Sequence, residues 1–181
     1  MNASDDDLIA QARQGPQEYR ALVERYQVRI YNLIYRMVGN PQDAEDLALE
    51  VFWRFYRSLD RFQAGAPVYP YLYRIATNLC LTHLKARRTL AEPLLDADLV
   101  PAPEGHPEVE QQRREQEAAL GGAIQSLPPR LRAALLLRHV EDLSYQEIAA
   151  ALEVPLGTVK TWLFRARQTL IERLKAEVVT P

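Results

Sequence analysis

The sequence predicts an all-α fold of two small helical domains joined by an acidic, proline-rich linker. Apolar residues recur every three or four positions through most of the chain, which is the period of a helix. Prolines and acidic residues gather between residues 89 and 109, where that period is lost. We therefore expect one helical domain over residues 5–88 and a second over residues 110–176.

Composition places the chain among soluble globular proteins. Of its 181 residues, 48% are hydrophobic and 25% charged, and the net charge is −2. The single cysteine, Cys80, excludes an internal disulfide and a cysteine-rich zinc site, and suits a reducing compartment. No apolar run approaches the roughly 18 residues of a membrane span, and the acidic N-terminus is unlike a signal peptide. We expect a cytoplasmic protein with no membrane contact of its own.

The first domain should open with a short helix and a long one. Ser4 can cap a helix over residues 5–14, and residues 16–38 carry an apolar stripe at helical spacing. Gly39 follows in the position that tolerates left-handed backbone, so it should end the long helix.

The next helix should cover residues 41–59. Asn40 and Pro41 suit its cap and first helical position. One side of the helix is apolar. Its first half also carries a cluster of acids: Asp43, Glu45, Asp46 and Glu50.

A loop over residues 61–67 should lead into the last helix of this domain. The alternation of residues 68–73 hints at a strand, but Pro70 fits the first turn of a helix, with Tyr69 before it extended. Basic residues crowd the C-terminal end of this helix: Lys85, Arg87 and Arg88.

The second domain should begin after the linker, with helices over residues 108–123 and 129–139 separated by a break at residues 126–129. Two more helices then follow within residues 143–170, LSYQEIAAALEVPLGTVKTWLFRARQTL.

The first of these helices starts with a capping box, Ser144 and Glu147, and Pro155 separates it from the second. The second helix has an apolar stripe on one face and Thr158, Thr161 and Arg165 on the other. This arrangement over residues 144–163 is typical of a helix-turn-helix that enters the DNA major groove. The alternative is an ordinary helical hairpin with a solvated basic face.

Three stretches in this order resemble the extracytoplasmic-function group of sigma-70 factors. NPQDAEDLALEVF resembles the acidic motif of region two, and YLYRIATNLCLTHLKARR resembles the helix that meets the −10 promoter element. LPPRLRAALLLRHVEDLSYQEIAAALEVPLGTVKTWLFRAR resembles region four, which meets the −35 element. The resemblance implies a non-catalytic transcription initiation factor that binds RNA polymerase core, through its largest and second-largest subunits, and promoter DNA. It also makes an anti-sigma factor a candidate partner.

The resemblance assigns roles to the charged clusters. It implies that the polymerase core is bound by Asp43, Glu45, Asp46 and Glu50. Favourable placement of acids near a helix N-terminus is the alternative explanation of that cluster.

The resemblance assigns a second set to the −10 element, where the strands separate: Phe62, Gln63, Tyr69, Arg74, Asn78, Lys85, Arg87 and Arg88. Here we expect Tyr71 and Tyr73 to pack in the core and leave Tyr69 open between packing and DNA. The basic cluster could also complement the helix dipole.

For the −35 element, base-edge contacts are expected from Lys160, Thr161, Phe164 and Arg165. Phosphate contacts are expected from Arg138, Thr158 and Arg167. Packing within the domain is the alternative for Phe164.

The sequence departs from the family pattern at several positions. Glu153 stands where the family usually has glycine, so a non-glycine residue is expected to take positive φ there. Thr77 and Thr82 replace a common Arg and Asp near the −10 set, and Trp162 replaces a common Arg in the last helix. Leu49 stands where the family usually has Gln.

No catalytic residues, metal site or cofactor are expected, because the three histidines do not cluster and no nucleophile–base pair or phosphate-binding glycine loop occurs. Two rival functions stay open at this point. One is a stand-alone helix-turn-helix regulator that uses only the second domain, and the other is an interaction protein without DNA binding.

Overall fold

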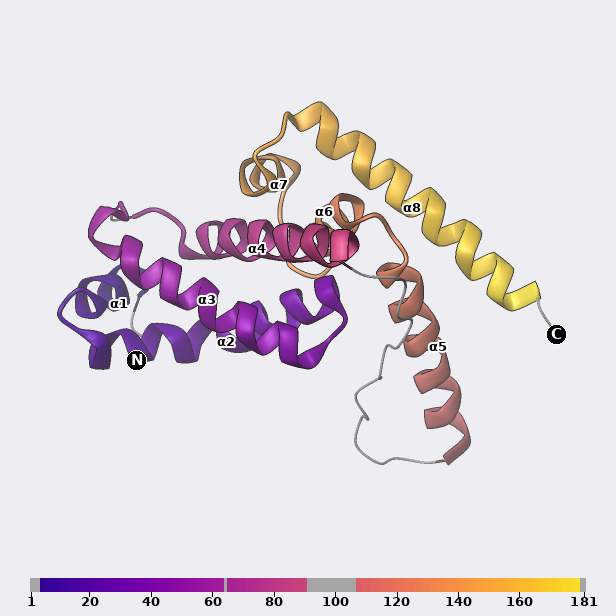
Figure 1. Ribbon diagram of the computed structural model, residues 1–181, viewed down its shortest axis with the longest axis horizontal. Helices are drawn as coiled ribbons and strands as arrows, with labels where there is room; N and C mark the ends of the chain where they lie inside the picture. The colour runs from indigo at the N-terminus through magenta and orange to yellow at the C-terminus, as the bar shows by residue number, and fades with distance from the viewer. Residues whose placement is uncertain (1–3, 64, 91–106, 180–181) are drawn as a thin grey trace.

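The computed structural model describes residues 4–63, 65–90 and 107–179, and all regular structure within these ranges is helical (Figure 1). The all-α prediction is therefore confirmed. The elements are α1 Asp5–Ala12, α2 Pro16–Val38, α3 Pro41–Ser58, the short 3-10 turn η1 Leu59–Arg61, α4 Val68–Leu90, α5 Pro107–Gln125, α6 Pro129–His139, α7 Tyr145–Leu152 and α8 Leu156–Val179.

The helix ends of the first domain follow the predicted signals. Ser4 and Asp7 form a capping box at the start of α1, which lowers the pKa of the Asp7 carboxyl through the hydrogen bonds it accepts. Gly39 ends α2 with φ 77°, and Asn40 Oδ1 accepts a hydrogen bond from the Asp43 amide, 3.0 Å away, at the start of α3.

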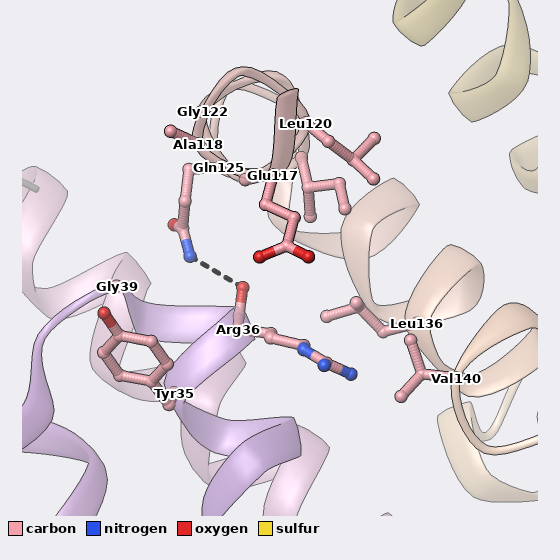
Figure 2. A pocket seen from close by; sticks show the side chains of 12 residues that line it. Tyr35, Arg36, Gly39, Glu117, Ala118, Leu120, Gly122, Gln125, Leu136 and Val140 are labelled. Carbon is pink, nitrogen blue, oxygen red and sulfur yellow. Dashed lines mark hydrogen bonds between the residues drawn. The ribbon is translucent and has the colours of Figure 1, made fainter. Parts of the chain in front are cut away.

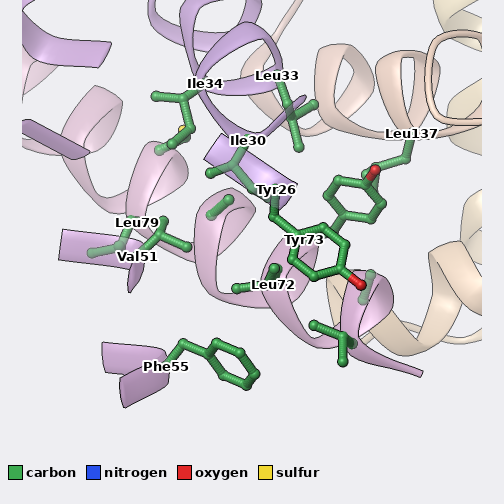
Figure 3. Close-up of a cluster of buried hydrophobic side chains, with 14 of the residues drawn as sticks. Tyr26, Ile30, Leu33, Ile34, Val51, Phe55, Leu72, Tyr73, Leu79 and Leu137 are labelled. Carbon is green, nitrogen blue, oxygen red and sulfur yellow. The ribbon is translucent and has the colours of Figure 1, made fainter. Parts of the chain in front are cut away.

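The core of the first domain lies among α2, α3 and α4, and α1 closes one end of α2. Figure 3 shows the apolar faces of these helices meeting, with Ile30 from α2, Phe55 from α3 and Leu72 from α4. All three side chains are fully buried. The apolar stripes read from the sequence are therefore the packed faces.

Helix α4 begins earlier than predicted. It starts at Val68, so Tyr69 is helical and not extended. Proline disfavours helical backbone in the residue before it, but Pro70 is in the first turn, where no intrahelical donor is needed. The ring of Tyr69 packs edge-on against Tyr26 at 4.4 Å between centroids, and this contact favours the helical start.

The second domain is arranged around α6. This helix is buried without a break from Arg132 to Leu137, because α8 packs on one side of it and the first domain on the other. Helices α7 and α8 pack together through Ile148, Val159 and Leu163, which are all buried. The long α8 then continues to the end of the described chain (Figure 1).

The two domains pack directly against each other. Helix α4 contacts α6 and α7, and α2 contacts α5 and α6, so one continuous apolar cluster includes residues of both domains. The middle of the predicted linker, residues 91–106, lies outside the described residues. Among the helices described, none combines the length and the apolar character that crossing a membrane requires.

Candidate nucleic-acid and polymerase interfaces

The pair α7–α8 has the geometry of a helix-turn-helix. Ser144 Oγ accepts a hydrogen bond from the Glu147 amide at 3.2 Å, and the Glu147 carboxylate accepts one from the Ser144 amide at 2.7 Å. Hydrogen bonds from the Ser144 side chain and backbone to the Glu147 carboxylate lower the pKa of Glu147. At the turn, Glu153 has φ 54°, which confirms the expected positive φ at a non-glycine residue.

The outer face of α8 is available to a ligand. Lys160, Thr161 and Arg165 are exposed, and Phe164 is 63% exposed, so Phe164 does not pack within the domain. The Thr161 hydroxyl donates to the Gly157 carbonyl at 3.0 Å. Its hydroxyl is thus engaged by the backbone, and the methyl group is the part of Thr161 suited to an apolar contact.

The three residues predicted to contact phosphates differ in accessibility. Arg167 is exposed, and its guanidinium lies 3.4 Å from the ring of His139. Thr158 is half-buried. Arg138 is also half-buried, because it donates to the Leu143 carbonyl at 2.9 Å and lies over the Tyr145 ring. Arg138 therefore holds the turn before α7 in addition to any contact with DNA.

Trp162 packs partly against the apolar cluster. Its ring is half-buried and lies 5.8 Å from the Arg130 guanidinium, a cation–π distance. Where the family commonly has Arg, Trp162 thus adds an aromatic packing contact.

The predicted −10 residues on α4 share a groove with the helix-turn-helix. Asn78, Lys85 and Arg88 line one side, and Trp162 and Arg165 line the other, around a volume of about 950 Å³. The groove is strongly basic: of the described residues that line it, Lys85, Arg88, Arg130 and Arg165 are cationic and Glu153 alone carries a carboxylate. Such a groove attracts polyanions.

Arg74 is held between the two domains. Its guanidinium lies 4.9 Å from the centroid of the Tyr71 ring and 3.8 Å from the Glu153 carboxylate. In this arrangement Arg74 is therefore occupied by protein groups.

One member of the predicted −10 set is buried. Phe62 is only 8% exposed, and its ring packs edge-on against Phe55 and Tyr71, with centroids 5.4 and 5.2 Å away. The resemblance assigned Phe62 to the −10 element. In the structure it follows the short turn η1 and belongs to the apolar core.

The remaining members of that set separate into exposed and packed groups. Gln63 and Arg87 are exposed, whereas Tyr69 is half-buried beneath Arg29, whose guanidinium lies 4.2 Å from the ring centroid. Packing thus accounts for Tyr69. Tyr73 is 1% exposed, as expected for a core residue, and Tyr71 is half-buried.

The surroundings of Thr77 account for its presence where the family commonly has Arg. It is fully buried, and its hydroxyl donates to the Tyr73 carbonyl at 2.7 Å. The hydroxyl is thus satisfied by the backbone of α4, so a small residue can be buried at this place.

The acidic cluster on α3 has two free and two paired members. Glu45 and Asp46 are exposed. Asp43 lies 3.0 Å from Arg87 and 3.3 Å from the His83 ring, and Glu50 lies 2.7 Å from Arg54. The charge that α3 can offer a partner therefore comes chiefly from Glu45 and Asp46.

An apolar groove that the sequence reading missed lies beside these acids. It has a volume of about 460 Å³ between α2 and α3, and Glu45 lines it together with Val28, Leu49 and Phe52. Val28 and Leu49 are 63% and 71% exposed. The available signal was that both residues lie off the apolar stripe of their helices; a single exposed apolar residue is ordinary, so only the packing of α2 beside α3 gathers them into one patch.

Two buried charges were also missed. Arg132 and Glu141 are 6% and 8% exposed, and each contacts the first domain. The available signal for Arg132 was an arginine inside an otherwise apolar stretch, although arginine is rarely buried without a partner. Within the described chain, no group of three His, Cys, Asp or Glu side chains is placed to hold a metal ion.

Comparison with known proteins identifies the class of protein. Residues 22–89 match the family model of Sigma-70 region 2, and residues 117–170 match that of Sigma-70, region 4. These are the two domains of a non-catalytic, promoter-specific transcription initiation factor.

Individual relatives narrow the class to one group. RNA polymerase sigma-H factor of Pseudomonas aeruginosa is 38% identical, and the alignment covers 94% of this chain and 94% of the relative. ECF RNA polymerase sigma-E factor of Escherichia coli is 33% identical, with 95% of each covered. ECF RNA polymerase sigma factor SigE of Mycolicibacterium smegmatis is 43% identical over 84% of this chain, which spans 60% of that relative. The chain belongs to the extracytoplasmic-function group of the sigma-70 family.

Solved structures share the fold. CnrH, solved in complex with the cytosolic domain of CnrY, has a TM-score of 0.71 at 24% identity, with 95% of this chain and 97% of CnrH covered. The sigma factor RpoE of Bartonella quintana, solved with the anti-sigma factor NepR, has a TM-score of 0.71 at 20% identity, with 88% and 98% covered.

Proposed function

We propose that this sigma factor divides promoter recognition between its two domains, with α8 reading the −35 duplex and α4 engaging the −10 element as its strands separate. The observation that carries the proposal is the outer face of α8. Its polar, basic and aromatic side chains are exposed, whereas Val159, Leu163 and Ala166 on the opposite face are buried.

At the −35 element, the side chains of α8 match base edges in the major groove. Lys160 and Arg165 suit the two acceptors of guanine, and Phe164 and the Thr161 methyl group suit the methyl group of thymine. Arg167, Thr158 and Arg138 fix the register through phosphates without reading sequence. Arg165 and Arg167 thus have different roles although they are two residues apart.

At the −10 element, Asn78, Lys85, Arg88 and Gln63 offer polar and cationic groups to a single strand. Removing a base from the stack costs a few kcal/mol, so contacts with the displaced base and its backbone must repay it. The half-buried Tyr69 would have to leave its contact with Arg29 before it could stack on a base. For this reason we assign backbone contacts to the cations and base contacts to Asn78 and Gln63.

For the polymerase core, we propose that α3 docks on the largest subunit through Glu45 and Asp46, with the apolar groove beside them covered by the same partner. A charged rim around an apolar centre is common in protein interfaces. The second domain would meet the second-largest subunit, as the family assignment implies.

An anti-sigma factor is a further proposed partner, because the structural neighbour RpoE of Bartonella quintana was solved with the anti-sigma factor NepR. We place the protein in the cytoplasm, where RNA polymerase acts.

Run-off transcription with core polymerase tests the proposal. Purified protein and core should start transcripts from a subset of genomic promoters, and aligned start sites should share −10 and −35 elements. Arg165→Ala should reduce these transcripts at matched protein concentration. Core that starts no transcripts with the wild-type protein on any bacterial template would overturn the proposal.

A further inference from the structure

Helix α1 holds the loop that carries Gln63. The described residues of this loop, between η1 and α4, are 62, 63 and 65–67. Figure 1 shows α1 at the same end of the first domain as this loop. Gln63 is exposed, and it is one of the two residues to which we assign base contacts at the −10 element.

Arg13, at the C-terminal end of α1, holds the backbone on one side of Gln63. Its Nε donates a hydrogen bond to the Leu59 carbonyl at 3.0 Å, and its Nη2 donates to the Phe62 carbonyl. Because the guanidinium is charged, such bonds are stronger than bonds between neutral groups. One side chain of α1 thus fixes the backbone of the residue directly before Gln63.

Asp6, near the other end of α1, holds the backbone on the other side of Gln63. The Gly65 amide donates to Asp6 Oδ1 at 2.8 Å. Gly65 has φ 77°, a left-handed conformation that glycine takes without steric strain. Within the loop, the Ala66 amide donates to the Gln63 carbonyl at 3.2 Å. Gln63 therefore lies between two points at which side chains of α1 hold the loop.

Helix α1 is itself fixed to the rest of the domain. Its residues Leu8, Ile9 and Ala12 are buried in the apolar cluster, and the helix packs against α2. The Asp5 carboxylate also lies 2.7 Å from the guanidinium of Arg25 on α2. The loop is therefore held against a rigid support.

The buried ring of Phe62 anchors the same loop from within. The ring packs against Phe55, while the carbonyl of Phe62 accepts the hydrogen bond from Arg13. These two contacts fix the direction of the backbone as it enters Gln63. An ordered loop loses less conformational entropy on binding than a mobile one, so the contacts made by α1 favour recognition of a base by Gln63.

We propose that Arg13 and Asp6 are positioning residues for −10 recognition. They hold the loop on both sides of Gln63, so that its side chain meets a displaced base in an ordered geometry. They act through the backbone of the loop and not by touching the DNA. The inference rests on the proposed base contact of Gln63.

A double-mutant cycle tests the inference with holoenzyme, assembled from core polymerase and the full chain. The probes are single-stranded −10 oligonucleotides taken from promoters that the wild-type protein uses, with each base varied in turn. Gln63→Ala identifies the position that Gln63 reads. Arg13→Ala should lower the preference for the correct base at that same position about tenfold, with affinity for core unchanged. The double variant should lose little more, because two residues that act through one contact are not additive.

Matched variants separate positioning from stability. Asp6→Ala removes the acceptor of the Gly65 amide and should lower the same preference, whereas Asp6→Asn keeps an acceptor oxygen and should retain it. Because Asp6 is exposed, this pair also serves if Arg13→Ala unfolds the domain. Gln125→Ala deletes a hydrogen bond of the same kind at the C-terminal end of α2, where Gln125 donates to the Arg36 carbonyl at 2.7 Å (Figure 2). It should leave every base preference unchanged.

The outcomes distinguish the inference from the proposed function. Wild-type base preference in folded Arg13→Ala or in Asp6→Ala would overturn the inference alone, and so would a loss at a different position from that of Gln63→Ala. An altered preference in Gln125→Ala would also overturn it, because a general loss of stability would then be sufficient. If Gln63→Ala changes the preference at no position, the proposed base contact of Gln63 fails, and the inference fails with it.

Discussion

Asp43 on α3 and Arg87 on α4 form an ion pair with 3.0 Å between nitrogen and oxygen. The first belongs to the acidic cluster proposed for polymerase docking, and the second to the basic set proposed for the −10 element. The ion pair removes one negative charge from the acidic cluster and one positive charge from the basic set. His83 lies 3.3 Å from the same carboxylate oxygen. The two functional sets are therefore not independent on the surface of the first domain, and their members should contribute unequally.

Asp46 should contribute more to polymerase binding than Asp43. We expect Asp46→Arg to weaken binding to core polymerase by tenfold or more, about 1.4 kcal/mol, because it places a cation against a basic partner surface. Asp43→Asn should have a much smaller effect, because its carboxylate is already paired within the protein. Fluorescence titration of core with labelled variants measures both. Equal losses for the two variants, with native circular dichroism, would contradict this ranking.

Arg165 and Arg167 should separate base reading from phosphate contact. Arg165→Ala should cost about 1–3 kcal/mol on the cognate −35 duplex and relax specificity at one base pair. Arg167→Ala should weaken cognate and scrambled duplexes alike and reduce the slope of log affinity against log salt by about 1. The two variants are matched, since each deletes one exposed guanidinium from α8. Identical specificity profiles for both would remove Arg165 from the base-reading set.

Local signals in the sequence were sufficient for the helices and for the outer face of α8. The capping residues Ser4, Asn40 and Ser144 and the left-handed Gly39 are determined by neighbouring backbone, so spacing alone identified them, whereas the positive φ of Glu153 was expected from the family resemblance. The error at Tyr69 came from treating the restriction before proline as decisive, when its contact with Tyr26 outweighs it.

Contacts between distant segments could not be predicted in this way. The resemblance assigned Phe62 to DNA, and no local pattern shows that it packs against Phe55 and Tyr71. Arg132 and Glu141 pair with groups far away in the chain, so their burial depends on how the domains pack. The paired state of Asp43 has the same origin. Site residues were thus identified best where accessibility follows from one helix alone.

Replacing Glu153 by glycine should stabilise the second domain, because glycine takes a positive φ without steric strain. At φ 54°, a residue with a Cβ atom costs roughly 1–2 kcal/mol, whereas glycine does not, although glycine loses more entropy on folding. We expect Glu153→Gly to raise the free energy of unfolding by about 0.5–1 kcal/mol in urea titrations. Glu153→Ala is the control, since it removes the same carboxylate and the ion pair with Arg74 but keeps the strain. Equal stability of the Gly and Ala variants would show that the left-handed turn stores no strain.

His139 should make the stability of the protein depend on pH. Burial, and then the positive charges of Arg167 and Arg138, lower the pKa of His139 from its ordinary value of 6.5. A histidine whose pKa is lowered by folding is protonated more readily in the unfolded chain, so its contribution to stability is present above about pH 6.5 and is lost as the pH falls through the folded pKa. We expect the free energy of unfolding to decline between about pH 7 and pH 5 more steeply for wild type than for His139→Gln, which cannot take a proton. Urea titrations at several pH values give the free energy of unfolding of each protein. The contributions of the other titrating groups cancel in the difference between the two. Parallel curves across this range would mean that folding does not lower the pKa of His139.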